Sequence, residues 1–141
     1  MFESIIDVAT VQAFRETEYR VHGDEPFTLK VGETCLALVD AHKRHRVDCS
    51  AYITAANPHS QTLDDHANAE RHAALGREIS QRSLASIEGT GLHQANQLPG
   101  EASHLIFGLT LEAAKTLGTR LEQNAIVWTG ADAVPQLILL R

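Results

Sequence analysis

Polar side chains in three stretches of the sequence have the residue types that hold small ligands. In the first stretch, the nearly apolar run 49–56 leads into Asn57, Pro58 and Ser60, and a helical pattern begins near Asp64. Free backbone N–H groups at the start of a helix attract polar or anionic groups. The candidate ligand-binding residues over the three stretches are Asn57, Ser60, Asn68, Arg71, Glu101, Gln123 and Asn124.

The first stretch also has a purely structural interpretation. An Asn-Pro pair initiates turns, the Ser60 hydroxyl can bond its own backbone, and Asp64 can cap the following helix. A carboxylate cap would itself occupy the positive end of the helix, which weakens an anion site there. Both interpretations stay open at this level.

Arg71 is the candidate with the strongest charge. It lies three residues after Asn68, so the two share a helix face that continues into the apolar residues Leu75 and Ile79. An arginine beside a core stripe can bind a carboxylate or phosphate through two parallel hydrogen bonds. The alternative is that Arg71 pairs with a structural carboxylate such as Glu101.

The remaining candidates lie at junctions between predicted elements. Glu101 ends a long loop, where it could act as a general base, pair with an arginine or remain a solvated charge. Gln123 and Asn124 join a helix to a strand. Adjacent amides there can bond a ligand's donors and acceptors, or they can cap the end of the helix.

The eight histidines do not predict a metal site. His42 and His45 share a helix face, as do His66 and Glu70, but neither pair belongs to a known metal signature. Cys49 lies inside an apolar run, where a reactive thiolate is disfavoured. We therefore predict no metal ion and no cofactor. The sequence contains no nucleophile motif, so it leaves open whether the protein is an enzyme.

Composition limits the class of protein. The chain has 141 residues and a net charge of −6, which predicts a single domain over residues 1–141 and argues against general binding to nucleic acids or anionic membranes. Two cysteines do not make a disulfide framework. The N-terminus lacks the pattern of a signal peptide, and no run approaches the ~18 apolar residues of a membrane span. A cytoplasmic protein is expected.

Periodicity predicts an α+β fold. Helices are expected over residues 4–15, 34–46, 64–82 and 111–121, and strands over 19–22, 27–31, 49–56, 84–87, 105–109, 125–128 and 137–140, with a long loop over 88–101. The uncharged run 49–56 suits a central strand buried on both faces. Hairpins and helical crossovers together imply a mixed or mostly antiparallel sheet with three to four helices packed on it.

These motifs together resemble a bacterial family of unknown function, domain-of-unknown-function family 3293. The resemblance runs from the strand at 19–21 to the C-terminal strand and rests on the segments 51–60, Asn68 with Arg71, 99–103 and 123–128. The chain departs from the family pattern at four positions: Asp64 replaces a serine, Ala67 a glutamate, and Leu121-Glu122 a Phe-Gly pair. The resemblance implies a bacterial cytosolic domain and no known activity.

Three hypotheses follow. The leading one is a domain that binds a small polar or anionic, nucleotide-like ligand, with Arg71 as the charge clamp. The second is a protein-interaction module of the inhibitor or immunity type, whose acidic balance would suit a basic protein partner. In the third, the same polar residues form a buried structural network that holds the loop 57–63 in place.

Overall fold

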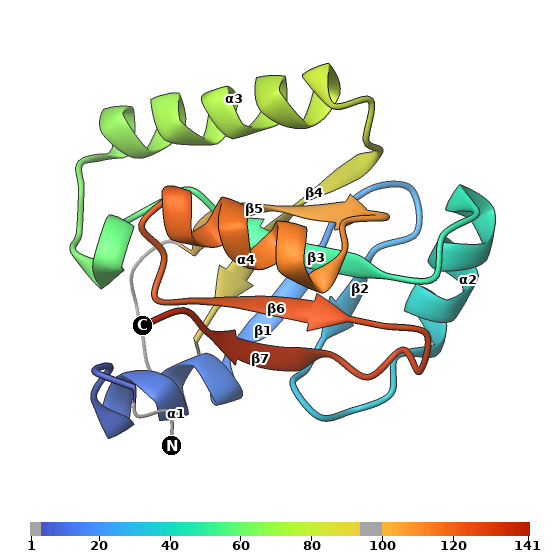
Figure 1. Ribbon diagram of the computed structural model, residues 1–141, viewed down its shortest axis with the longest axis horizontal. Helices are drawn as coiled ribbons and strands as arrows, with labels where there is room; N and C mark the ends of the chain where they lie inside the picture. Colours follow the sequence, from blue (N-terminus) through green and yellow to red (C-terminus); the bar gives the residue numbers. More distant parts are fainter. Residues whose placement is uncertain (1–3, 94–99) are drawn as a thin grey trace.

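The computed structural model describes residues 4–93 and 100–141, and it has the predicted α+β fold (Figure 1). Within these residues the helices are α1 (Val8–Glu16), α2 (Leu36–His45), α3 (Asp65–Gln81) and α4 (Leu111–Arg120), with a short 3-10 turn η1 (Pro58–Ser60). The strands are β1 (Glu18–Val21), β2 (Phe27–Leu29), β3 (Ser50–Thr54), β4 (Ser86–Leu92), β5 (Glu101–Phe107), β6 (Ala125–Thr129) and β7 (Gln136–Leu139).

The seven strands form one sheet in the order β2-β1-β4-β5-β3-β6-β7. Each pairing between the described strands is antiparallel. The predicted hairpin is confirmed, since β1 pairs with β2. The prediction of a buried central strand is also confirmed: β3 lies between β5 and β6, and four of its five residues are buried.

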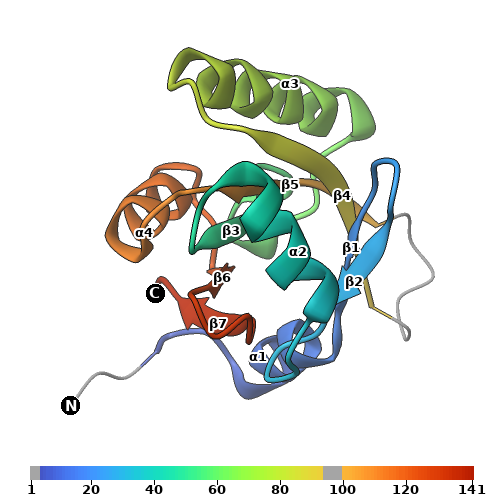
Figure 2. The same ribbon diagram turned by 90° about the vertical axis from the view of Figure 1, so that its right-hand side faces the viewer.

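Alternating side chains of β3 face two separate apolar cores. Ala51 and Ile53 pack with residues of α3 and α4 on one face of the sheet. Tyr52 packs on the other face with residues of α2. Figure 2 shows the sheet curling so that α2 lies on its inner side, with α3 and α4 outside. The helices α2, α3 and α4 therefore each contribute an apolar stripe to a sheet face, as the periodicity requires, whereas α1 has no buried residue.

Acidic caps set the starts of two helices. Asp7 Oδ1 accepts from Thr10 N at 2.9 Å, so α1 begins at Val8 instead of residue 4. Asp64 Oδ1 accepts from Ala67 N at 2.7 Å and begins α3. The predicted cap at Asp64 is thus confirmed, and its carboxylate occupies the helix start that would otherwise attract an anion.

The predicted long loop over 88–101 is wrong at both ends. β4 continues to Leu92 and β5 already begins at Glu101, while residues 94–99 lie outside the described part of the chain. Glycines in this stretch favour a loop on propensity alone. Gly89 is required in the strand because a Cβ there would lie 2.2 Å from the carbonyl oxygen of Arg20, which also accepts a bond from Tyr52 Oη at 2.9 Å.

None of the helices in residues 4–93 and 100–141 combines the length and the apolar character needed to cross a membrane.

Candidate functional site

The loop between β3 and α3 has an unusual backbone. Asn57, His59 and Ser60 have φ angles of 48°, 51° and 60°, in the left-handed region. Asparagine is among the residues that tolerate this region best. The backbone N of His59 donates to the carbonyl of Glu122 at 2.6 Å. The loop is therefore tied to the junction between α4 and β6.

Asn57 links three segments through its side chain and backbone. Its Oδ1 accepts from Leu63 N at 3.0 Å and from Asn68 Nδ2 at 2.9 Å. Its Nδ2 donates to Glu101 Oε2 at 2.8 Å, and its backbone N donates to Asn68 Oδ1 at 3.0 Å. These bonds connect the loop to α3 and to the start of β5.

Arg71 bonds two backbone carbonyls from different parts of the fold. Its Nε donates to Ala55 O at 2.5 Å and its Nη2 donates to Leu121 O at 2.7 Å. The ion pair with Glu101 that was one alternative is absent, since the carboxylate bonds Asn57 instead. The guanidinium joins the end of β3 to the end of α4.

The side-chain amides of Gln123 and Asn124, at the junction between α4 and β6, both bond to the loop that follows β3. Gln123 Nε2 donates to Ala56 O at 3.0 Å, and Asn124 Nδ2 donates to Ser60 Oγ at 2.8 Å. Each amide residue is only 7% exposed. All seven predicted residues therefore lie in, or hydrogen-bond to, the segment 55–63, and we call them the polar cluster.

Most polar groups of the polar cluster bond each other or the backbone, and this fixes the loop. Two charged atoms are exceptions. Arg71 Nη1 and Glu101 Oε1 have no hydrogen-bond partner among the described residues. Within the described residues, the cluster thus keeps one cationic donor and one carboxylate acceptor without a hydrogen-bond partner.

Burial raises the pKa of Glu101, and the hydrogen bond from Asn57 only partly opposes this effect. A raised folded-state pKa means that the folded protein favours the protonated form. The stability that protonated Glu101 contributes is therefore fully present below the unfolded-state pKa, about 4.3. As the pH rises from there through the higher folded-state pKa, the free energy of unfolding falls by this contribution, and at still higher pH it no longer changes.

Replacing Glu101 with glutamine should therefore raise the free energy of unfolding at about pH 7 relative to the parent, with a smaller gain at about pH 4. The amide oxygen still accepts from Asn57, while the cost of burying a charge disappears. Urea unfolding at both pH values measures the two differences, with Glu33→Gln at an exposed position as control. An equal difference at both pH values would contradict the pKa direction.

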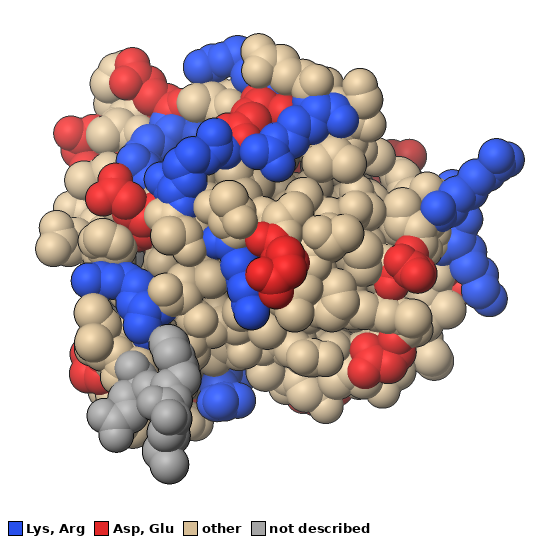
Figure 3. Space-filling view, in the orientation of Figure 1, with Lys and Arg blue, Asp and Glu red and all other residues tan. Residues whose placement is uncertain are grey.

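Two hollows of the described surface lie away from the polar cluster. One, of about 460 Å³, is lined by Ala74, Arg77, Glu78, Gln81, Arg82 and Arg120 of α3, its C-terminal end and α4. Figure 3 shows basic and acidic side chains intermixed over this face. Glu78 bonds both Arg82, at 2.7 Å, and Arg120. The second hollow is lined by residues of the segments 15–18 and 30–33 together with His93.

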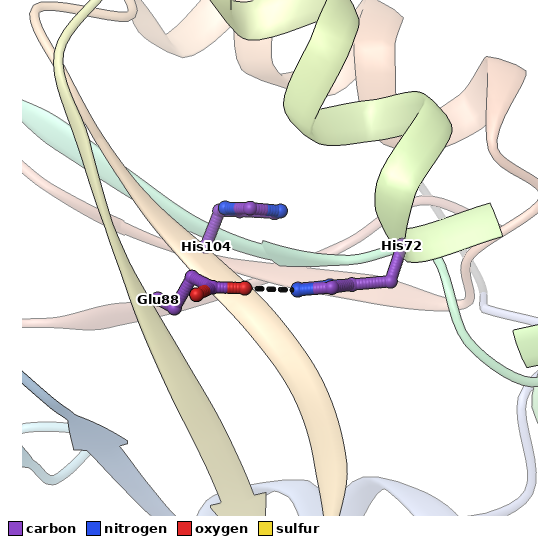
Figure 4. Close-up of side chains that lie close together, drawn as sticks. All are labelled: His72, Glu88 and His104. Carbon is purple, nitrogen blue, oxygen red and sulfur yellow. Dashed lines mark hydrogen bonds and ion pairs between the residues drawn. The ribbon is translucent and has the colours of Figure 1, made fainter. Parts of the chain in front are cut away.

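Sequence reasoning missed one group of side chains, His72, Glu88 and His104 (Figure 4), which we call the His–Glu–His group. His72 Nε2 lies 2.7 Å from Glu88 Oε1, and the two imidazole rings stack at 4.3 Å between centroids. The residues are far apart in sequence, and the sequence pattern predicts a loop at Glu88 where the structure has β4. The signal that could have found them is the strand pairing that sets Glu88 opposite His104.

The fold and site define an α+β domain whose loop between β3 and α3 gathers polar side chains from α3, β5 and the α4–β6 junction. Residues 53–126 match the family described as Protein of unknown function (DUF3293), and the chain belongs to this family. The expected resemblance is thus confirmed over 53–126, which contains the polar cluster and the His–Glu–His group. Neither the curated proteins nor the solved structures contain a match.

Proposed function

We propose that the protein binds a small polar or anionic, nucleotide-like ligand at the edge of the polar cluster. The observation that carries this proposal is that Arg71 Nη1 and Glu101 Oε1 have no hydrogen-bond partner within residues 4–93 and 100–141. Small-molecule sites use a small number of precisely placed polar or charged groups to orient the ligand.

The chemistry of the two atoms indicates what the ligand must offer. Arg71 Nη1 can donate to a phosphate or carboxylate oxygen, and Glu101 Oε1 can accept from a hydroxyl or amine. A nucleotide carries both kinds of group. Because Asp64 already occupies the start of α3, the anionic part would depend on Arg71 and not on the helix terminus.

Native mass spectrometry of the purified protein tests the proposal. We expect a co-purified mass increment, or a rise in melting temperature with adenosine monophosphate, that is reduced in Glu101→Gln and in Ser60→Ala. Ser60 is exposed, so its replacement leaves the core intact. The matched control is Arg77→Ala, which removes an exposed arginine from α3, the helix that also contains Arg71. This variant should bind as the parent does.

The opposite result has a definite meaning. If the parent carries no added mass and neither adenosine monophosphate nor inorganic phosphate shifts its melting temperature, ligand binding is wrong. The polar cluster is then the structural network of the third hypothesis.

A protein-interaction function has less support: the exposed large apolar residues of the described chain are Ile5, Val8 and Leu36, which come from two separate segments.

We also propose that residues 1–141 act as one cytoplasmic domain. Strands from the first and last parts of the chain belong to the same sheet, which supports a single folding unit. Cys35 and Cys49 are both free, which fits a reducing compartment.

A further inference from the structure

The sheet and α3 bring three metal-binding side chains together outside the polar cluster. Glu88 of β4 and His104 of β5 are direct partners in the antiparallel register, so their side chains leave the same face of the sheet. His72 approaches this face from α3, and its ring stacks on that of His104 with an angle of 10° between their planes. Three separate elements therefore supply one donor each.

The side chain of His104 makes no hydrogen bond within the described chain. The residue is only 5% exposed, and neither of its ring nitrogens has a partner among residues 4–93 and 100–141. The Nδ1 of His72 is also buried without one. Buried polar groups are nearly always bonded, because leaving one unpaired forfeits its interaction with water. An imidazole lone pair in this state indicates a partner of another kind.

We propose that His72, Glu88 and His104 bind a divalent transition-metal cation, with zinc the best match. One ligand atom from each residue lies within 4.8 Å of the others. Zinc takes imidazole nitrogens and carboxylate oxygens at about 2.0–2.2 Å, so its ligand atoms lie roughly 3.3 Å apart. Because an imidazole lone pair lies in its ring plane, binding one ion requires the rings of His72 and His104 to turn out of their stack. The Glu88 side chain is 69% exposed, so it can follow this movement.

The charge state of the group suits a cation. The hydrogen bond from His72 lowers the pKa of Glu88, which keeps this carboxylate ionised. Burial lowers the pKa of His104, which keeps its imidazole neutral and able to donate a lone pair. Two nitrogens and one oxygen favour zinc over calcium or magnesium, which prefer oxygen ligands. Because the Glu88 side chain is 69% exposed, a water molecule can supply the fourth ligand of the zinc ion.

Titration of the metal-free protein with Zn²⁺ and with Co²⁺ tests the site. We expect one strong site per chain by calorimetry and the visible absorption bands of four- or five-coordinate Co²⁺. Glu88→Gln and His104→Leu should each weaken Zn²⁺ binding by about 100-fold or more, since even groups that only orient a ligand contribute about 10- to 100-fold. Both variants should also abolish the Co²⁺ bands.

The chain offers a matched control in the exposed pair His66 and Glu70 of α3, in which His66 Nε2 lies 3.2 Å from Glu70 Oε1. The double variant His66→Ala, Glu70→Gln should bind Zn²⁺ as tightly as the parent. His104→Leu should melt no lower than the metal-free parent, because the lost imidazole makes no hydrogen bond. Glu88→Gln provides the same test at a surface position if His104→Leu misfolds.

Three outcomes would overturn the proposal. The first is the lack of a strong site in the parent. The second is Zn²⁺ binding that survives Glu88→Gln and His104→Leu unchanged. The third is Zn²⁺ binding that falls equally in the His66/Glu70 control. Binding at the polar cluster is measured with different probes and different variants, so the two proposals can fail independently.

Discussion

Replacement of Arg71 with alanine is expected to lower the free energy of unfolding by about 3–5 kcal/mol, because a hydrogen bond to a charged group contributes about 1.5–3 kcal/mol and Arg71 makes two. The carbonyls of Ala55 and Leu121 lose their guanidinium donor together. Proteins of this kind are stable by about 5–15 kcal/mol, so the variant should lose a large share of its stability. Urea unfolding followed by circular dichroism measures the loss.

Two further variants define the cause of this loss. Arg77→Ala removes an exposed arginine from the same helix and should change stability by no more than about 0.5 kcal/mol. Arg71→Lys keeps the charge but can reach only one carbonyl at a time, so an intermediate loss is expected. If Arg71→Ala costs less than about 1 kcal/mol, the bridge between β3 and α4 contributes no more than an ordinary hydrogen bond.

Replacement of Asn57 with alanine should cost about 4 kcal/mol through two separate effects. The side chain makes bonds to Leu63, Asn68 and Glu101, each worth about 1 kcal/mol, and their loss leaves polar groups unpaired. Alanine also has no side-chain group that stabilises the left-handed φ of 48°. Thermal and urea unfolding at neutral pH measure the total.

Asn57→Gly separates the two effects, since glycine adopts positive φ without strain. It should be about 1 kcal/mol more stable than Asn57→Ala. Gln61→Ala, at an exposed position of the same loop with ordinary backbone angles, is the control and should be nearly neutral. Equal stability of Asn57→Ala and Asn57→Gly would show that the backbone conformation of the loop is not strained.

Local patterns predicted most of the elements because their physical causes lie within a few residues. The cap at Asp64 needs only the backbone of Ala67, three residues away, and the apolar stripe of Leu75 and Ile79 needs only helical spacing. The buried strand β3 follows from an uncharged run. The members of the polar cluster were likewise found from residue type and position at junctions, and all seven meet at the segment 55–63.

What each residue bonds could not be predicted in the same way. Arg71 bonds carbonyls at Ala55 and Leu121, which are 16 and 50 positions away, instead of a carboxylate. The sequence carries no signal for such a choice because every residue offers a carbonyl. The extent of β4 was missed because glycine lowers strand propensity, whereas the crowding of Gly89 against Arg20 exists only once β1 and β4 pair.

The sequence by itself therefore determined the α+β class, the central strand and the seven residues that gather around the loop, since periodicity, capping and residue type are local properties. Only the tertiary structure decided that His104 lies opposite Glu88 and stacks on His72, and that its ring nitrogens have no partner among the described residues. The reason is physical: the register of two strands and the position of a helix over them depend on packing across the whole sheet. The eight histidines of the sequence gave no sign of this group, and the folded chain brings two of them together.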